Sequence, residues 1–147
     1  MTDPRPAAAA TAHPAFSAAW AEAWGRELNA NPTYQQVAAR WEGDIVLEMS
    51  VAGAAAGPAI YLDLWHGVCR AARAATEADH GTARYLFQAP REAWRQVLGG
   101  KLSPAMAILT GKLRLARGSL ADFLPYASAA EELLRTGGAI EATFPDD

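Results

Sequence analysis

The chain has 147 residues, of which 13 are Lys or Arg and 16 are Asp or Glu, and its formal net charge is −3. This is the length of one ordinary domain, its charge excludes a strongly basic nucleic-acid binder, and its single cysteine excludes an internal disulfide or a Cys-rich metal site. No apolar run approaches the roughly 20 residues of a membrane span, and the N-terminus lacks the apolar core of a secretory signal, so we expect a cytoplasmic protein.

The N-terminal third predicts an arm followed by two helices. Residues 1–13 are rich in Pro and Ala and lack periodicity, which predicts a disordered arm. The first helix carries large apolar residues four positions apart, at Phe16, Trp20, Trp24 and Leu28. The second begins at Pro32 after the N-cap Asn31, and its expected buried residues are Tyr34, Val37, Ala38 and Trp41. We interpret residues 14–42 as an N-terminal helical extension whose tryptophans could form a docking face.

A change of hydrophobic period from 3.6 to 2 predicts strands after residue 43. Apolar residues alternate in 45–51 and 60–65, and the Gly/Ala-rich stretch 52–58 between them predicts a hairpin. Residues 68–75 fit a strand or a helix, and we interpret them as a strand because turn signals flank them. A polar turn is expected at 77–81 and a further strand at 83–88, with Tyr85 and Phe87 on one face.

Short helices dominate the prediction for the C-terminal half. Segments 90–98 and 103–109 each begin near a proline and end near a glycine, which is typical of short helices. A strand is expected at 112–117 and a helix at 119–136, which Pro125 should kink or restart. Residues 137–147 are expected to form a tail, on which Ile140 and Phe144 could dock. This order predicts an α+β fold with a mainly antiparallel sheet covered on one face by helices.

The sequence contains no motif for catalysis, metal binding or a cofactor. The histidines His13, His66 and His80 lack zinc-ligand spacing, and Cys69 lies in a predicted strand, where a small buried residue is the expected role. The glycine patterns of phosphate-binding loops and of hydrolase nucleophile elbows are missing. Seven basic residues lie between Arg84 and Arg117, and they fit either a transient contact with a membrane surface or an ordinary solvated rim, which we favour.

One stretch resembles the sterol carrier protein-2 (SCP2) family. Its marks are Gly100-Lys101, Ser103-Pro104, the apolar helix Met106 to Leu109, the run Gly111-Lys112-Leu113-Arg114-Leu115, and Gly118. The resemblance covers residues 43 to 134, and the Ala and Arg bias is typical of a bacterial protein. We therefore predict four parts of the chain: an arm (1–13), the helical extension (14–42), an SCP2-like lipid-binding domain (43–136) and a tail (137–147).

The resemblance implies a five-stranded, mainly antiparallel sheet with helices over one face and a hydrophobic tunnel between them. The tunnel would take a fatty acyl chain, acyl-CoA, a sterol-like lipid or an isoprenoid, without catalytic residues or a cofactor. Matched residues expected to line it are Phe87, Trp94, Leu98, Met106, Ile108, Leu109, Leu113 and Leu115. The last helix would close it through Phe123, Leu124, Ala127 and Leu134.

Three functions remain open from the sequence. The first is a non-enzymatic lipid carrier. The second is an accessory protein that presents an isoprenoid-quinone-type substrate to a partner enzyme, with the N-terminal helices docking that enzyme or a second copy of the chain. The third is a structural or interaction domain with a filled core.

Overall fold

A five-stranded mixed sheet forms the centre of the fold in a computed structural model that describes residues 12–144. Its strands are β2 (Glu42–Ser50), β3 (Ala59–Trp65), β4 (Val68–Ala74), β5 (Tyr85–Pro90) and β6 (Arg114–Arg117), in the order β4-β3-β2-β5-β6. β2 and β5 pair in parallel, and the other neighbours are antiparallel. The predicted α+β class and mainly antiparallel sheet are confirmed, including the ambiguous strand at β4. The arm predicted at residues 1–11 lies outside the described part of the chain.

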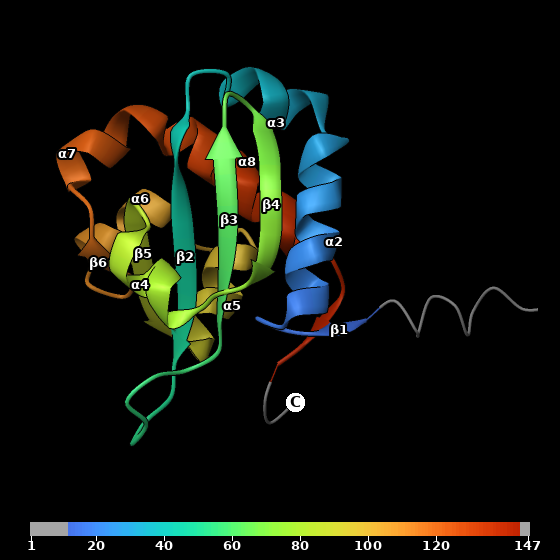
Figure 1. Ribbon diagram of the computed structural model, residues 1–147. Coiled ribbons are helices and arrows are strands. Elements are labelled where there is room, and N and C mark those ends of the chain that lie inside the picture. The colour runs from blue at the N-terminus through green and yellow to red at the C-terminus, as the bar shows by residue number, and fades with distance from the viewer. Residues whose placement is uncertain (1–11, 145–147) are drawn as a thin grey trace, which may run out of the picture.

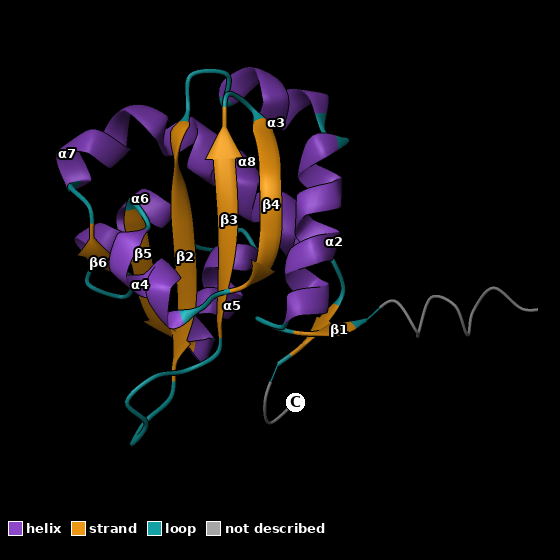
Figure 2. Ribbon diagram, viewed as in Figure 1, coloured by secondary structure: helices purple, strands orange, loops and turns teal. Residues whose placement is uncertain are grey.

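Helices form a layer on one face of this sheet (Figures 1 and 2). They are α2 (Ala18–Asn29), α3 (Pro32–Val37), α5 (Arg91–Leu98), α6 (Pro104–Leu109), α7 (Leu120–Phe123), the 3₁₀ turn η1 (Leu124–Tyr126) and α8 (Ala127–Gly138). α4 (Glu77–Thr82) lies on the opposite face, where it covers a small second cluster that contains Val46, Ala83 and Leu86. In residues 12–144, no helix is both long and apolar enough to cross a bilayer.

The alternation of apolar residues along β2 directs one set of side chains into the core. Ile45, Leu47 and Met49 are 1%, 3% and 1% exposed. Ile45 is paired with Leu62 and Leu47 with Ile60, so the inward faces of β2 and β3 coincide as the period predicts.

The N-terminal helices belong to the same hydrophobic core as the sheet. Trp20 and Trp24 are 1% and 0% exposed, and the Trp24 indole Nε1 donates a hydrogen bond to the Leu133 carbonyl of α8 at 3.0 Å. The expectation that these tryptophans form a docking face is therefore wrong, because both side chains are buried in the core, where Trp24 joins α2 to α8. α3 is also shorter than predicted: it ends at Val37, which is 42% exposed, because a turn follows before Trp41 enters the core.

The turn predicted at residues 77–81 is the helix α4. The Thr76 hydroxyl accepts a hydrogen bond from the Asp79 backbone N–H at 3.2 Å, and the Asp79 carboxylate accepts one from the Thr76 N–H at 2.8 Å. This reciprocal capping box starts a helix in a segment too short to show periodicity. Arg73 of β4 pairs with Asp79 and ties the helix to the sheet. β5 accordingly begins at Tyr85, two residues later than predicted, and continues to Pro90.

The C-terminal region breaks at Pro125 as predicted, since η1 separates α7 from α8. α8 continues to Gly138, beyond the predicted end at Thr136, and a Cβ on Gly137 would lie 2.5 Å from the Trp24 ring. A glycine inside the helix therefore allows α8 to approach α2. After α8, β7 (Ala142–Thr143) pairs with β1 (His13–Pro14), and Ile140 and Phe144 pack partly against the core. The division of the chain at residues 42 and 136 stays a prediction.

Candidate functional site

A small cavity lined only by apolar side chains lies between the sheet and the helices. Its volume is about 20 Å³, little more than one water molecule requires. Its lining residues come from the sheet, from α5 to α8 and from the segments that join them: Trp41, Ile45, Leu47, Phe87, Trp94, Pro104, Leu113, Phe123, Ala130, Leu133 and Leu134. The residues present offer no polar group to a ligand here, so any binding would rest on desolvation of apolar surface.

Backbone pairing and one indole hydrogen bond position the sheet side of this cavity. Leu47 of β2 is in register with Phe87 of the parallel strand β5, so both side chains point to the helical layer. The Trp94 indole Nε1 on α5 donates to the Glu48 carbonyl at 2.9 Å, which fixes the indole against β2. The Trp94 ring is fully buried in consequence.

Aromatic rings form the wall towards α7. The Phe123 ring lies 5.3 Å from Phe87, 5.9 Å from Tyr85 and 6.2 Å from Trp41, measured between centroids. The three contacts are edge-to-face, the arrangement that aromatic quadrupoles favour.

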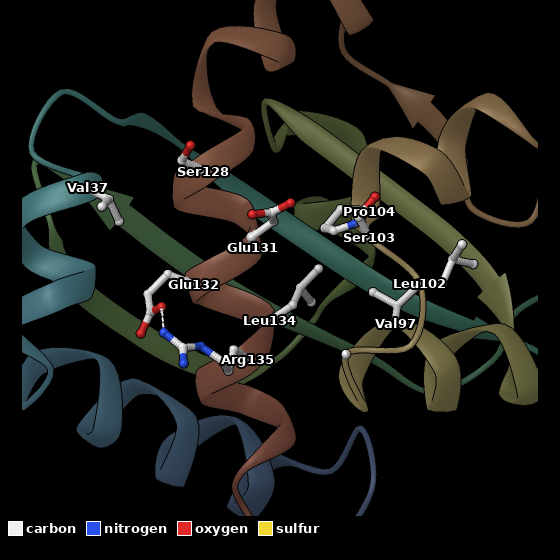
Figure 3. A pocket seen from close by; sticks show the side chains of 11 residues that line it. Val37, Val97, Leu102, Ser103, Pro104, Ser128, Glu131, Glu132, Leu134 and Arg135 are labelled. Atoms are coloured by element: carbon white, nitrogen blue, oxygen red, sulfur yellow. Dashed lines mark hydrogen bonds and ion pairs between the residues drawn. The ribbon is translucent and has the colours of Figure 1, made fainter.

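A larger groove lies outside the cavity, between α8 and the segment that links α5 to α6. Its volume is about 410 Å³. Figure 3 shows Leu134 of α8 opposite Val97 and Pro104 across this groove. Pro104 and Leu134 line both the groove and the inner cavity, so these two side chains form the wall between them.

Polar side chains on the outer edge of the groove fasten α8 to α3. The Glu132 carboxylate accepts hydrogen bonds from Asn31 Nδ2 at 2.9 Å and from the Arg135 guanidinium. Burial raises the pKa of Glu132, but these hydrogen bonds outweigh it and hold the pKa below its usual value. Glu132 therefore stays ionised at neutral pH and its contact with Asn31 persists, so α3 and α8 form one unit beside the groove.

The structure brings together five of the twelve residues predicted to line a tunnel. Phe87, Trp94, Leu113, Phe123 and Leu134 all line the inner cavity. Of the expected tunnel, these five residues therefore mark only the central part of the contact between the sheet and the helices.

The other seven predicted residues lie elsewhere. Leu98 is buried but lines a separate groove near the end of α8, while Ile108, Leu115 and Ala127 are half-buried. Met106, Leu109 and Leu124 are 50%, 67% and 47% exposed, which corrects the expectation that they face the interior.

The orientation of α6 explains the outward position of Met106 and Leu109. The Ala107 carbonyl accepts hydrogen bonds from the backbone N–H groups of Lys112 and Leu113, at 2.9 and 3.0 Å. These bonds turn the chain back towards the sheet and place Leu113 in the cavity, with Ala107 and Pro104 as the inward face of α6. Met106 and Leu109 then point to solvent.

Six lining residues were not assigned to the site from the sequence: Trp41, Ile45, Leu47, Pro104, Ala130 and Leu133. The alternating pattern of β2 was the available signal for Ile45 and Leu47, since it places both on the core face. The small residues Pro104 and Ala130 carry no such signal.

Polar groups on the opposite face of the sheet form hydrogen-bonded pairs. The Glu48 carboxylate accepts from Gln88 at 3.0 Å and from the Gly57 N–H at 3.0 Å, and it lies 3.2 Å from His80 Nε2. On the helical side of the sheet, burial raises the pKa of the Cys69 thiol to about 11, which agrees with the predicted role of Cys69 as a small buried residue. Among residues 12–144, no group of three His, Cys, Asp or Glu is placed to hold a metal ion.

Comparison with known proteins identifies relatives of this fold. A sequence model described as the SCP-2 sterol transfer family matches residues 23–127. A crystal structure of sterol carrier protein 2 is 39% identical, with a TM-score of 0.77, and the match covers 86% of this chain and 98% of that one. The solution structure of a conserved hypothetical protein from Thermus thermophilus, described as a possible sterol carrier protein, is 38% identical with a TM-score of 0.76 over 87% and 90% of the two chains.

A more distant structure shares the fold alone. It is the apo form of sterol carrier protein 2 from Yarrowia lipolytica, which is 18% identical with a TM-score of 0.54 over 79% of this chain and 88% of that one. A comparison with curated proteins gives no match.

Proposed function

Because the chain belongs to the SCP-2 sterol transfer family, we propose that it binds and carries an apolar lipid between its sheet and its helices, without catalysing a reaction. The observation that carries this proposal is the inner cavity, whose lining is entirely apolar. The ligand would be a fatty acyl chain, acyl-CoA, a sterol-like lipid or an isoprenoid.

The ligand needs more space than the inner cavity offers. Lipid-sized ligands occupy pockets of roughly 300 Å³ or more, whereas the cavity holds about 20 Å³. The outer groove of about 410 Å³ adjoins it, separated by Pro104 and Leu134. We therefore place the route of uptake at this wall, where a shift of α6 away from α8 would join the two spaces.

The energy for this opening would come from desolvation of the lipid. Each buried methylene contributes about 0.8 kcal/mol, so a chain of a dozen carbons offers about 10 kcal/mol before the cost of separating the helices. A polar headgroup would remain at the groove, where Ser103, Glu131 and Arg135 supply hydrogen-bonding groups.

The second candidate is a structural or interaction domain with a filled core. The small size of the cavity favours it, since the side chains already occupy almost all the space between the layers. An accessory role, with the same cavity presenting a quinone-type lipid to a partner enzyme, would need a docking surface other than the buried tryptophans.

A binding titration with a matched pair of variants separates these candidates. A fluorescent fatty acid such as parinaric acid should saturate the wild-type protein at one molecule per chain. Ala130→Leu, which extends a cavity-lining side chain, should weaken this binding at least tenfold, while Ala121→Leu makes the same change on an exposed position of α7 and should leave it unchanged. Thermal melting checks that both variants fold. Absence of binding to the wild type, or equal binding by Ala130→Leu, would favour the filled core.

A further inference from the structure

α6 exposes two of its three large apolar side chains and buries two of its small residues. Met106 and Leu109, one helical turn apart, are 50% and 67% exposed, whereas Pro104 and Ala107 form the buried side. An amphipathic helix of a globular domain ordinarily shows the opposite arrangement. Neighbouring exposed apolar side chains of this kind indicate an interaction surface.

Basic residues flank this helix without acidic neighbours in the sequence. Residues 99–118 contain Lys101, Lys112, Arg114 and Arg117, and they contain no Asp or Glu, although the whole chain carries a net charge of −3. All four side chains are exposed. Within residues 12–144 none of them takes part in an ion pair. The positive charge of this segment is therefore available to an external partner.

We propose that Met106, Leu109, Lys101 and Lys112 form a docking surface, the α6 face, for a bilayer that contains anionic lipids. Lys101 lies three residues before the start of α6 and Lys112 three residues after its end, so the two basic residues flank Met106 and Leu109 along the chain. Such a surface inserts apolar side chains among acyl chains while lysines remain at the level of the headgroups.

The charge and size of the α6 face favour a bilayer over a protein partner. Two large apolar side chains are few for the core of a stable protein interface, which typically buries about 800 Å² on each side. The charged residues around Met106 and Leu109 in the sequence are all basic, and they are attracted by the negative surface potential of a leaflet that contains anionic lipids. Docking would also bring the wall at Pro104, the first residue of α6, next to a source of lipid. The inference goes beyond the proposed cavity, because vesicle binding requires no occupied cavity.

Vesicle sedimentation tests the proposal directly. Wild-type protein should bind vesicles of 70% phosphatidylcholine and 30% phosphatidylglycerol, and vesicles of phosphatidylcholine alone at least tenfold more weakly. Met106→Ser with Leu109→Ser, and separately Lys101→Gln with Lys112→Gln, should each weaken binding to the anionic vesicles about tenfold or more.

The matched control removes exposed apolar side chains elsewhere. Val51 and Val68 are each 47% exposed, so Val51→Ser with Val68→Ser should change vesicle binding less than twofold. Failure of the wild type to bind anionic vesicles, or an equal loss in the control, would overturn the proposal.

A fluorescent label gives a second measurement that does not depend on loss of binding. The chain has one cysteine, Cys69, which is buried, so an environment-sensitive dye can be attached to a new exposed thiol in Leu109→Cys. Its emission should shift to the blue on anionic vesicles, while the same dye in Val51→Cys should not respond. A response at both positions, or a dimer that buries the Leu109 label without vesicles, would overturn the proposal.

Discussion

Replacing Leu134 with Ala tests whether a ligand reaches the inner cavity through the wall shared with the outer groove. Leu134 is 6% exposed and lines both spaces, while its neighbour Leu133 is 3% exposed and lines only the inner cavity. Leu133→Ala is therefore the matched control on the same helix. Each variant removes three carbons, and with the cavity left behind should lose about 3 kcal/mol of unfolding free energy.

The two variants should differ in the rate of ligand uptake. If opening the wall exposes half of the Leu134 side chain, Leu134→Ala avoids about 1.2 kcal/mol of that cost, which corresponds to uptake about eightfold faster. Leu133→Ala leaves the wall intact, so its rate should stay within about twofold of the wild type.

Stopped-flow mixing with parinaric acid measures the rates, and urea unfolding measures the stabilities. Equal acceleration in both variants would attribute the effect to general loosening of α8. No acceleration in Leu134→Ala would refute the route between α6 and α8.

Two further predictions concern stability. Asp79→Asn should lower the free energy of unfolding at pH 7 by about 1 kcal/mol, because the hydrogen bond from Arg73 and the capping box hold the pKa of Asp79 below its usual value. This contribution to stability is present above the unfolded-state pKa of Asp79 and is lost as the pH falls through the lower folded-state pKa. The difference in unfolding free energy between wild type and variant, measured in urea, should therefore shrink below about pH 4. A difference that does not change with pH would contradict the claim that the ionised Asp79 carboxylate stabilises the fold. Gly137→Ala should lower the melting temperature, with a loss of about 2 kcal/mol or more, since its Cβ would lie 2.5 Å from the Trp24 ring. Gly81→Ala, whose Cβ would meet nothing within 4 Å, should be neutral or stabilising by about 0.5 kcal/mol, and equal effects of the two changes would contradict this account of the α2–α8 contact.

Local patterns in the sequence predicted most elements of the fold. The alternation around Ile45 and Leu47 defined β2 because side chains of a strand point to opposite faces in turn. Pro125 defined the break before α8 because proline lacks a backbone N–H. The parallel pairing of β2 with β5 was not predictable in this way, since it joins segments 40 residues apart through backbone hydrogen bonds that leave no local pattern.

The site was less predictable than the fold, because it depends on the orientation of short helices. Met106 and Leu109 were expected inside because they are apolar members of the segment that resembles the SCP2 family, but the hydrogen bonds to the Ala107 carbonyl turn them outward. The residues that carry the resemblance lie between Gly100 and Gly118, whereas the lining residues Leu47 and Trp41 come from β2 and from the segment before it.

The most direct test of lipid binding is an NMR experiment on the protein with a ¹³C-labelled fatty acid of twelve carbons. Isotope-filtered NOEs should connect the acyl chain with methyl groups of Ile45, Leu113 and Leu133, which line the inner cavity. NOEs confined to Met106 and Leu109 at the surface, or none at all, would contradict the claim that lipid occupies the space between the sheet and the helices.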